Sequence, residues 1–374
     1  MIRWIKMRKI FSKIILLNII IWVLFFPVVF AEEEIMDGYF TVVEEKTGKM
    51  IFMTSMYVHV GDQFLDENNR LYEVKRIDGR KGYAEFKEKI DLGNLFAVEG
   101  LLAKYGVRTN QKIGVYFTHN DESYEPTDGS ETIQGRGGIH KVGKILAAVL
   151  EKKGIQAIVS DNIHLPHDAA AYKRSRRTAT SLLKKGLDAL IDVHRDGIPS
   201  SEYYAEKVAG QWVTQIKLVV GRQNPQRQVN DNFAKQLKAA ADKLYPGLIK
   251  GIFYAKGNYN QDLAPRSILV EVGTFKNHRE SAERGVALFG NVVTAALYGE
   301  DALKNKGPGG TAAPIKGESS STIKSLLLIM LLAVIAAVLY VVISGGSWEE
   351  IKSKINKFAK EEFANLLGRK KNKE

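Results

Sequence analysis

The sequence contains no cysteine among its 374 residues. This absence excludes a disulfide framework, thiolate zinc fingers, iron–sulfur clusters and a cysteine nucleophile. Any metal ion bound by the chain must therefore be held by histidine, aspartate and glutamate side chains. With 45% hydrophobic and 26% charged residues, the composition is that of a folded protein rather than a disordered one.

Between its two ends the chain also has little excess positive charge. The formal net charge is +12, but residues 1–31 hold five basic and no acidic residues, and residues 345–374 hold eight basic and five acidic residues. Only +4 remains for the residues between these ends. A phosphate-binding surface needs a concentrated basic stripe, so nucleic acid is not an expected partner.

Residues 1–31 are typical of an export signal. A basic leader that ends at Lys13 precedes the apolar run 14–30, and Val29 and Ala31 stand at the two positions that a signal peptidase reads. We expect cleavage after Ala31. An uncleaved signal anchor is the alternative, because the apolar run is about as long as a membrane-spanning helix.

A second apolar run near the other end predicts a transmembrane helix at 324–344. It follows a stretch rich in glycine, proline and serine at 301–323, which predicts a flexible linker. Residues 345–374 place lysines among apolar residues at helical spacing, which predicts an amphipathic basic tail. Because positive charge stays on the cytoplasmic side, we expect this tail inside the cell membrane and the residues before the linker outside it.

The part of the chain that is expected outside the membrane shows two different hydrophobic patterns. Residues 36–98 show short alternating runs separated by turn residues, which predicts a small all-β module. Residues 107–300 alternate strands with helices, which predicts an α/β domain with a mixed or largely parallel sheet flanked by helices. Its expected strands are 113–117, 156–160, 189–193, 216–220 and 267–272, and its expected helices are 139–153, 169–185, 229–244 and 279–297.

Three of these expected strands end in residues that can bind metal, and function collects at strand carboxyl ends in open α/β sheets. His119 and then Glu122 follow the first strand, His194 follows the third, and Glu271 lies near the end of the last. Two neutral imidazoles and one carboxylate leave a zinc ion with an open position for water, and a further carboxylate can take that water's proton. The sequence therefore predicts a hydrolytic zinc site.

Other polar residues are weaker candidates. His140 and His278 fall on or beside expected helices, where surface and capping roles are common. His167 lies in a loop that could border a cleft, and we expect it, together with Arg195, on the substrate side of the site. Three arginines of the expected helix 169–185 fit either carboxylate binding or a solvated helix face, namely Arg174, Arg176 and Arg177.

Four segments carry a family signature: Thr118–Tyr124, His167-Asp168 with Tyr172 and Ser175-Arg176, Ile191–Asp196, and Val270–Thr274 with Asn277. In order and spacing they resemble the stage II sporulation protein P family, which belongs to the zinc-dependent N-acetylmuramoyl-L-alanine amidases. The resemblance covers roughly residues 107–299, and its most specific parts are the sequences HRD and VEVGT. The β-rich region before it also resembles the amino-terminal region of that family.

The resemblance implies His119 and His194 as zinc ligands and Glu271 as the catalytic carboxylate. It leaves the third ligand open between Glu122, which we prefer, and Glu131, which stands where the wider amidase superfamily takes its glutamate. It also implies an endopeptidase activity on cross-linked stems and a partnership with a sporulation protein D-like lytic transglycosylase. The expected transmembrane helix after the catalytic domain departs from the single amino-terminal anchor of the family.

The expected function is therefore a membrane-tethered, extracytoplasmic zinc amidase that cleaves the lactyl–L-alanine amide of peptidoglycan. One alternative keeps the metal, because the same order of ligands fits a zinc carboxypeptidase that acts on stem peptides. Another is an inactive wall-binding or assembly protein. The products released from peptidoglycan distinguish the amidase from the carboxypeptidase, and metal content tests the inactive wall-binding protein.

Overall fold

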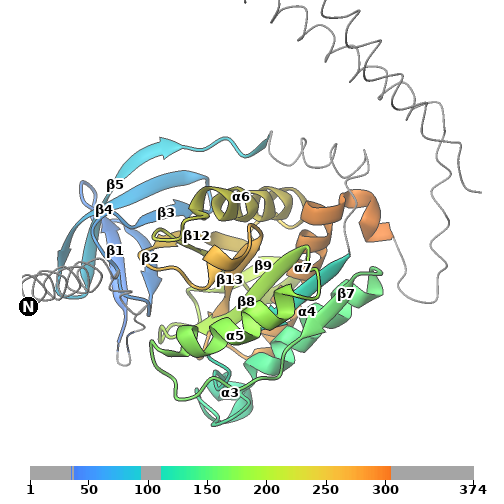
Figure 1. Cartoon of the computed structure of the whole chain (residues 1–374). Coiled ribbons are helices and arrows are strands. Elements are labelled where there is room, and N and C mark those ends of the chain that lie inside the picture. The colour runs from blue at the N-terminus through green and yellow to red at the C-terminus, as the bar shows by residue number, and fades with distance from the viewer. Residues whose placement is uncertain (1–34, 36–37, 94–110, 305–374) are drawn as a thin grey trace, which may run out of the picture. The chain divides into compact units, whose positions relative to one another are not determined.

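The computed structural model describes residues 35, 38–93 and 111–304, which form a mixed α/β fold around one large sheet (Figure 1). Within these residues the sheet has 11 strands, in the order β2-β1-β5-β4-β3-β12-β11-β13-β8-β6-β7. The strands are β1 (Phe40–Glu44), β2 (Met50–Thr54), β3 (Gln63–Asp66), β4 (Arg70–Asp78), β5 (Lys81–Lys89), β6 (Lys112–Tyr116), β7 (Gln156–Val159), β8 (Ala189–Asp196), β11 (Ile216–Gly221), β12 (Ile249–Ala255) and β13 (Ser267–Thr274). A separate hairpin pairs β9 (Ala205–Val208) with β10 (Gln211–Thr214).

Six neighbouring strands, from β12 to β7, form the part of the sheet that carries the candidate site. Their contacts are parallel except between β11 and β13, which are antiparallel. All residues of β8, β11 and β13 are buried, as is usual for central strands that are covered on both faces. The predicted mixed, largely parallel sheet is therefore confirmed.

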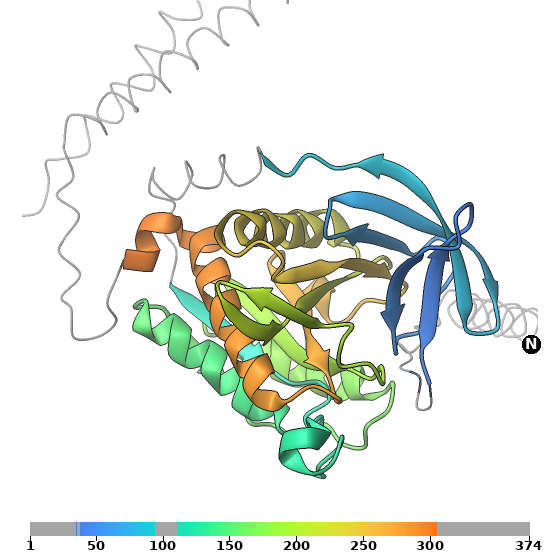
Figure 2. The same ribbon diagram turned by 180° about the vertical axis from the view of Figure 1, so that it is seen from behind.

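Helices cover both faces of these six strands (Figure 1, Figure 2). On one face, α4 (Ile139–Lys152), α6 (Arg227–Leu244) and α7 (Arg279–Tyr298) share one core with apolar strand residues such as Val193 and Val270. On the other face, α5 (Ala171–Leu183) packs Ala179 and Leu182 against Tyr116 and Leu190. Since successive strand residues point to opposite faces, every second residue of β8 after Leu190 lies on the α5 face: Asp192, His194 and Asp196.

The N-terminal strands β1 to β5 continue the main sheet. Strand β3 pairs antiparallel with β12, which places Phe64 opposite Phe253. The ring of Phe52, on β2, stacks on Phe64 at 4.5 Å and lies 5.0 Å from the ring of Phe253. The expectation of a separate all-β module is therefore not confirmed. The continuity of the sheet could not be foreseen, because β3 has four residues without alternation and β12 contains Lys250 and Gly251, so the sequence of neither segment predicted a strand.

Several expected segments lie outside the described residues: the export signal at 1–31, most of the linker at 301–323, the transmembrane helix at 324–344 and the basic tail at 345–374. Among the helices that the structure does describe, none is both long and apolar enough to cross a bilayer. The described residues also include short elements that the patterns did not predict: α3 (Glu125–Asp128) and the 3₁₀ helices η1 (Gln261–Leu263) and η2 (Glu300–Lys304).

Candidate functional site

Three polar residues occupy one row across neighbouring central strands. Glu271 lies opposite His194 in the pairing of β13 with β8, and Lys217 lies opposite Glu271 in the pairing of β11 with β13. Cross-strand partners point to the same face of a sheet, so all three side chains lie on the α5 face. His119 approaches this row from the segment that follows β6, at the strand end where the sequence predicted it.

A buried group of three side chains can hold a metal ion. His119, Glu122 and His194 each offer one ligand atom, and these atoms lie within 4.8 Å of one another. The Nδ1 atoms of His119 and His194 lie 3.5 and 3.3 Å from Oε1 of Glu122. Tetrahedral zinc with bonds of about 2.1 Å separates its ligand atoms by about 3.4 Å. The donor set therefore fits zinc in both its chemistry and its spacing.

The side chains of this group are completely shielded from solvent. Charges within and around the group therefore strongly shift the pKa values of Glu122 and His194. Burial by itself raises the pKa of Glu122, but His194, His119 and Arg195 outweigh it and lower that pKa to about 2. Burial lowers the pKa of His194, but Asp192 and Glu122 outweigh it and raise that pKa well above its ordinary value. The group thus favours a positive charge between its ligand atoms, which a metal ion supplies.

Asp192 orients the second histidine. Its Oδ1 lies 3.2 Å from Nε2 of His194 and accepts a hydrogen bond from the backbone N–H of Thr118 at 2.9 Å. The hydroxyl of Thr118 donates to the other carboxylate oxygen at 2.5 Å. A carboxylate at the second ring nitrogen fixes the orientation of a metal-binding histidine and raises its basicity. The sequence placed Asp192 beside His194 but did not predict this role.

The loop between Glu122 and α4 holds the third member of the group in place. Oε2 of Glu122 accepts a hydrogen bond from the backbone N–H of Arg195 at 2.8 Å, which ties the carboxylate to β8. The returning loop crosses close behind it, and a Cβ atom on Gly137 would lie 2.0 Å from the carbonyl oxygen of Glu122. Only glycine permits this approach, so Gly137 is required for the position of Glu122.

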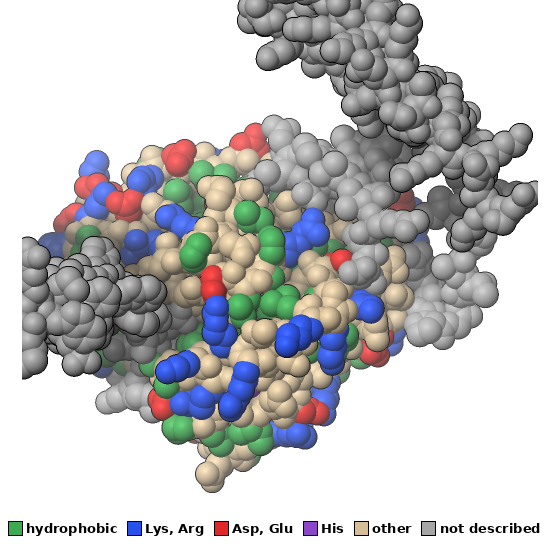
Figure 3. Space-filling view, viewed as in Figure 1, with side chains coloured by type: hydrophobic (Ala, Val, Ile, Leu, Met, Phe, Trp, Pro, Cys, Tyr) green, Lys and Arg blue, Asp and Glu red, His purple; other side chains and the backbone are tan. Residues whose placement is uncertain are grey.

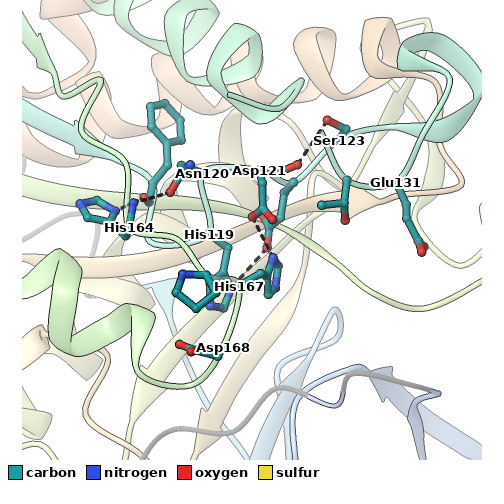
Figure 4. Close-up of polar contacts among 12 residues, drawn as sticks. His119, Asn120, Asp121, Ser123, Glu131, His164, His167 and Asp168 are labelled. Atoms are coloured by element: carbon teal, nitrogen blue, oxygen red, sulfur yellow. Dashed lines mark hydrogen bonds and ion pairs between the residues drawn. The ribbon is translucent and has the colours of Figure 1, made fainter. Parts of the chain in front are cut away.

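Glu131, the alternative third ligand, does not join the group. Its side chain is exposed, and Figure 4 shows its carboxyl lying apart from His119 and His167. Its backbone carbonyl instead accepts hydrogen bonds from Ser123 N–H at 2.9 Å and from the guanidinium of Arg195 at 3.0 Å. The structure thus places Glu122 with the two histidines and leaves Glu131 at the surface.

Glu271 has the environment of a group that exchanges protons. The residue is only 2% exposed, and its Oε2 is buried without a hydrogen-bond partner. Burial and the nearby Asp196 raise its pKa well above the ordinary value, and the opposing effects of Lys217 and His194 do not cancel this rise. A buried oxygen with no partner beside a potential metal centre is a candidate contact for a water molecule or a substrate.

His167 lies against the metal group, although it is distant from it in the sequence. Its ring stacks on that of His119 with centroids 4.1 Å apart. Its Nδ1 lies 2.8 Å from Oδ1 of Asp121, the contact drawn in Figure 4. An ionised carboxylate only accepts hydrogen bonds, so Nδ1 carries the proton. Tyr172 of α5 lies edge-on to His119 at 5.4 Å and completes this side of the site.

Two arginines of α5, Arg174 and Arg176, are committed to contacts within the protein, whereas the guanidinium of Arg195 keeps one nitrogen without a partner. Arg195 is 8% exposed, and its buried Nε has no hydrogen-bond partner. Arg174 binds Asp168 and the carbonyl oxygen of His164, and Arg176 binds Asp262 at 2.8 Å. Figure 3 shows basic side chains that gather over α5. The exposed basic residues within and just after this helix include Lys173, Arg177, Lys184 and Lys185.

The remaining histidines of the α/β part do not reach the metal group. His164 is buried, with its ring nitrogens 2.8 Å from the carbonyl oxygen of Phe117 and 2.8 Å from the hydroxyl of Thr178. His140 packs on the ring of Phe117 at 4.2 Å, and burial lowers its pKa. His278 immediately precedes α7 and makes no side-chain capping bond. His164 and His140 are thus part of the packing around the site, and His278 is exposed.

Comparison with known proteins identifies a family. The family model described as stage II sporulation protein P matches residues 64–294. A curated relative, the stage II sporulation protein P of Bacillus subtilis (strain 168), is 32% identical over 190 residues, which are 46% of this chain and 47% of the relative. The chain thus aligns with about half the length of that curated relative.

Solved structures with a similar arrangement of elements include two bacterial proteins. One is the N-acetylmuramoyl-L-alanine amidase AmiC2 of Nostoc punctiforme, with 12% identity, a TM-score of 0.31, and coverage of 51% of this chain and 97% of that chain. The other is the CwlD amidase from Clostridioides difficile in complex with the GerS lipoprotein, with 12% identity, a TM-score of 0.35, and coverage of 52% and 98%.

Proposed function

This chain belongs to the stage II sporulation protein P family, and we propose that it is a zinc-dependent N-acetylmuramoyl-L-alanine amidase. It would cut the amide between the lactyl group of muramic acid and the first L-alanine of the stem peptide. The observation that carries the proposal is the buried donor group of His119, Glu122 and His194, with Glu271 in the next strand. A site of this kind serves hydrolysis of an amide.

The three donor residues would hold the zinc ion. When bound, zinc would polarise the scissile carbonyl and lower the pKa of a bound water to about 7. Asp192 keeps the ring of His194 in place through its contact with Nε2. Arg195 fixes Glu122 by donating its backbone N–H to Oε2, so neither ligand has to reorganise during the reaction.

Glu271 is proposed as the residue that moves the proton. Its Oε2 would accept the proton of the attacking water and return it to the nitrogen of the leaving L-alanine. Burial and the nearby Asp196 raise the pKa of this carboxyl, so its carboxylate form binds a proton more readily than that of an ordinary glutamate.

Two further residues are proposed to bind the substrate. His167 is 18% exposed at its side chain and lies against His119, so it borders the route by which a stem peptide would approach. Arg195 has a buried Nε without a hydrogen-bond partner, and its guanidinium can bind a stem-peptide carboxylate. Asp121 holds the imidazole of His167 in one orientation.

The cellular setting is also a proposal. The catalytic part would lie outside the cell membrane, tethered through the linker at 301–323 and the apolar segment at 324–344, with the basic tail in the cytoplasm. Its partners would be peptidoglycan, the membrane and a sporulation protein D-like lytic transglycosylase. An endopeptidase activity on cross-linked stems would accompany the amidase activity.

A zinc carboxypeptidase is the second candidate, and one observation favours keeping it. Glu122 stands three residues after His119 in the same donor group, and a His-x-x-Glu pair followed by a distant histidine is also the ligand order of zinc carboxypeptidases. An inactive wall-binding protein is disfavoured because all four residues of the proposed site are present and buried.

Product analysis tests the proposal. Purified peptidoglycan is incubated with the zinc-loaded chain, with and without a chelator, and the soluble products are identified by mass spectrometry. An amidase releases intact stem peptides and leaves the glycan strands whole, whereas a carboxypeptidase releases single amino acids. Release that continues unchanged after zinc removal, or release of amino acids alone, would overturn the assignment.

A further inference from the structure

A buried polar network joins the N-terminal strands to the strand that carries His194. Its centre is Asp196, which ends β8 and is completely buried. Oδ1 of Asp196 accepts hydrogen bonds from both the backbone N–H and the hydroxyl of Ser55, each at 2.9 Å. Oδ2 accepts from the hydroxyl of Tyr204 at 2.8 Å and from the ammonium group of Lys217.

Lys217 links this network to the proposed catalytic carboxylate. The side chain is completely buried, and its ammonium group also donates to the hydroxyl of Thr54 at 2.9 Å. Lys217 stands opposite Glu271 in the pairing of β11 with β13. Lysine is almost never fully buried unless it is paired, and a buried ion pair is weak support for stability in itself. The buried position of Lys217 is therefore better explained by a role at the catalytic site than by a contribution to the stability of the fold.

The segment that contains Ser55 fits tightly against the end of β8. The backbone N–H of Gly197 donates to the hydroxyl of Ser55 at 2.9 Å. A Cβ atom on Gly197 would lie 2.8 Å from Cβ of Ser55, which is closer than side-chain atoms approach. The residue after Asp196 must therefore be glycine for Ser55 to reach the carboxylate. The contact thus depends on Ser55 on one side and on Gly197 on the other.

We propose that Ser55 and Lys217 are positioning residues of the catalytic site. Together they hold Asp196, and thereby the end of β8 that carries His194, at a fixed distance from Glu271. Ser55 lies before residue 64, where the match to the family model begins, so the region ahead of that match helps to build the site. The inference rests on the amidase function proposed above.

The test replaces Ser55 by alanine in the full-length chain. Ser55→Ala removes the hydroxyl that bonds Asp196 and Gly197 but keeps the backbone contact. At full zinc occupancy, kcat for release of stem peptides should fall about 10- to 100-fold with KM unchanged, the range typical of losing a contact that supports a metal site from outside its ligands. Hydrogen–deuterium exchange should also become faster at residues 194–198, because Gly197 loses its acceptor.

Val42→Ala is the matched control, since Val42 is a buried residue of β1 in the core of the same strands. It should lower the melting temperature and leave kcat below that temperature unchanged. The proposal is overturned if Ser55→Ala keeps its kcat within twofold of the original chain, or if Val42→Ala loses kcat to the same degree.

Lys217 needs a paired design because Lys217→Met leaves the Asp196 carboxylate buried without a counter-charge, which strongly destabilises the fold. The double variant Lys217→Met with Asp196→Asn removes both charges. It should fold and bind zinc but show a reduced kcat, and a kcat equal to that of the original chain would contradict the role given to Lys217. If the unmodified chain releases no stem peptide, the amidase proposal fails, and the exchange measurement on Ser55→Ala still decides whether Ser55 holds the end of β8.

Discussion

Glu271 lies directly opposite His194 in the parallel pairing of β13 with β8. This register places a buried carboxyl on the same face of the sheet as a metal-ligand candidate, so the strand pairing decides which two side chains face each other. Strand pairing is among the most rigid contacts in a fold, and a site built on it is held more precisely than one built on loops. Substitutions of the two residues should nevertheless have different effects on zinc binding and on activity.

His119→Ala and His194→Ala should each lose bound zinc and activity together, because each removes one nitrogen ligand from the group. Glu271→Gln keeps the size of the side chain but removes the group that accepts the proton. It should retain zinc and lose about 10²- to 10⁴-fold in rate. Zinc measured by mass spectrometry, beside a peptidoglycan-release assay, separates the two behaviours. Loss of zinc from Glu271→Gln would show that Glu271 is itself a ligand.

The third ligand is decided by two glutamate variants. Glu122→Ala should weaken zinc binding strongly, since Oε1 of Glu122 lies within 3.5 Å of both histidine nitrogens. Glu131→Ala should bind zinc as the original chain does, because its exposed side chain contributes nothing to the group. Zinc dissociation constants from competition with a chelator provide the measurement. Weaker binding in Glu131→Ala with unchanged binding in Glu122→Ala would reverse the assignment.

The strand ends that carry the site could be predicted from sequence because the strands themselves are continuous apolar runs. Ile113–Phe117 and Ala189–Val193 are followed at once by histidine-containing segments. Chain order and the parallel pairing of such strands bring their carboxyl ends together. His119, Glu122 and His194 therefore appear in the structure as one group, as the sequence analysis expected.

The contacts that support these residues could not be predicted, because they join segments distant in sequence. Asp121 and His167 are separated by 46 positions and Ser55 and Asp196 by 141. No periodic pattern encodes such pairs. Lys217 stands inside an apolar strand run, where its pattern indicates a strand but does not reveal that its ammonium group is buried. Likewise, the pairing of β3 with β12 depends on tertiary packing and not on the local pattern of β3.

Asp121→Asn tests the role of His167. The amide oxygen can still accept the proton of Nδ1 of His167, but it carries no charge, so it holds the imidazole less firmly. We expect activity to fall about 10- to 100-fold, with zinc content unchanged, because Asp121 is not one of the three donors. Asp168→Asn is the control, since Asp168 binds Arg174 at the surface; its activity should not change. An equal loss in both variants would indicate a general effect on the loop rather than on His167.

The N-terminal strands contain an acid-sensitive cluster. Lys75 and Lys87, at 2.5 and 2.6 Å from the carboxylate of Glu73, lower its pKa to about 2, below the ordinary value of 4.5. A carboxyl with a depressed folded-state pKa stabilises the fold above its unfolded pKa, and this stabilisation is lost as the pH falls through the folded value. Glu73→Gln should therefore unfold at lower denaturant concentration than the original chain at pH 7, and the difference should shrink between about pH 4.5 and pH 2. If the difference between the two unfolding concentrations stays constant over this range, Glu73 is not its source.

Truncation tests whether the N-terminal strands belong to the catalytic unit. In the described residues, β12 is bonded to β3 on one side, and the ring of Phe253 is covered by Phe52. A chain limited to residues 107–300 would expose this strand edge together with apolar surface, a combination that promotes aggregation. A chain of residues 32–323 keeps the pairing and should be soluble and active. Size-exclusion chromatography and the peptidoglycan-release assay compare the two. A monomeric, fully active chain of residues 107–300 would show that the first five strands are dispensable, and it would count equally against the positioning role of Ser55.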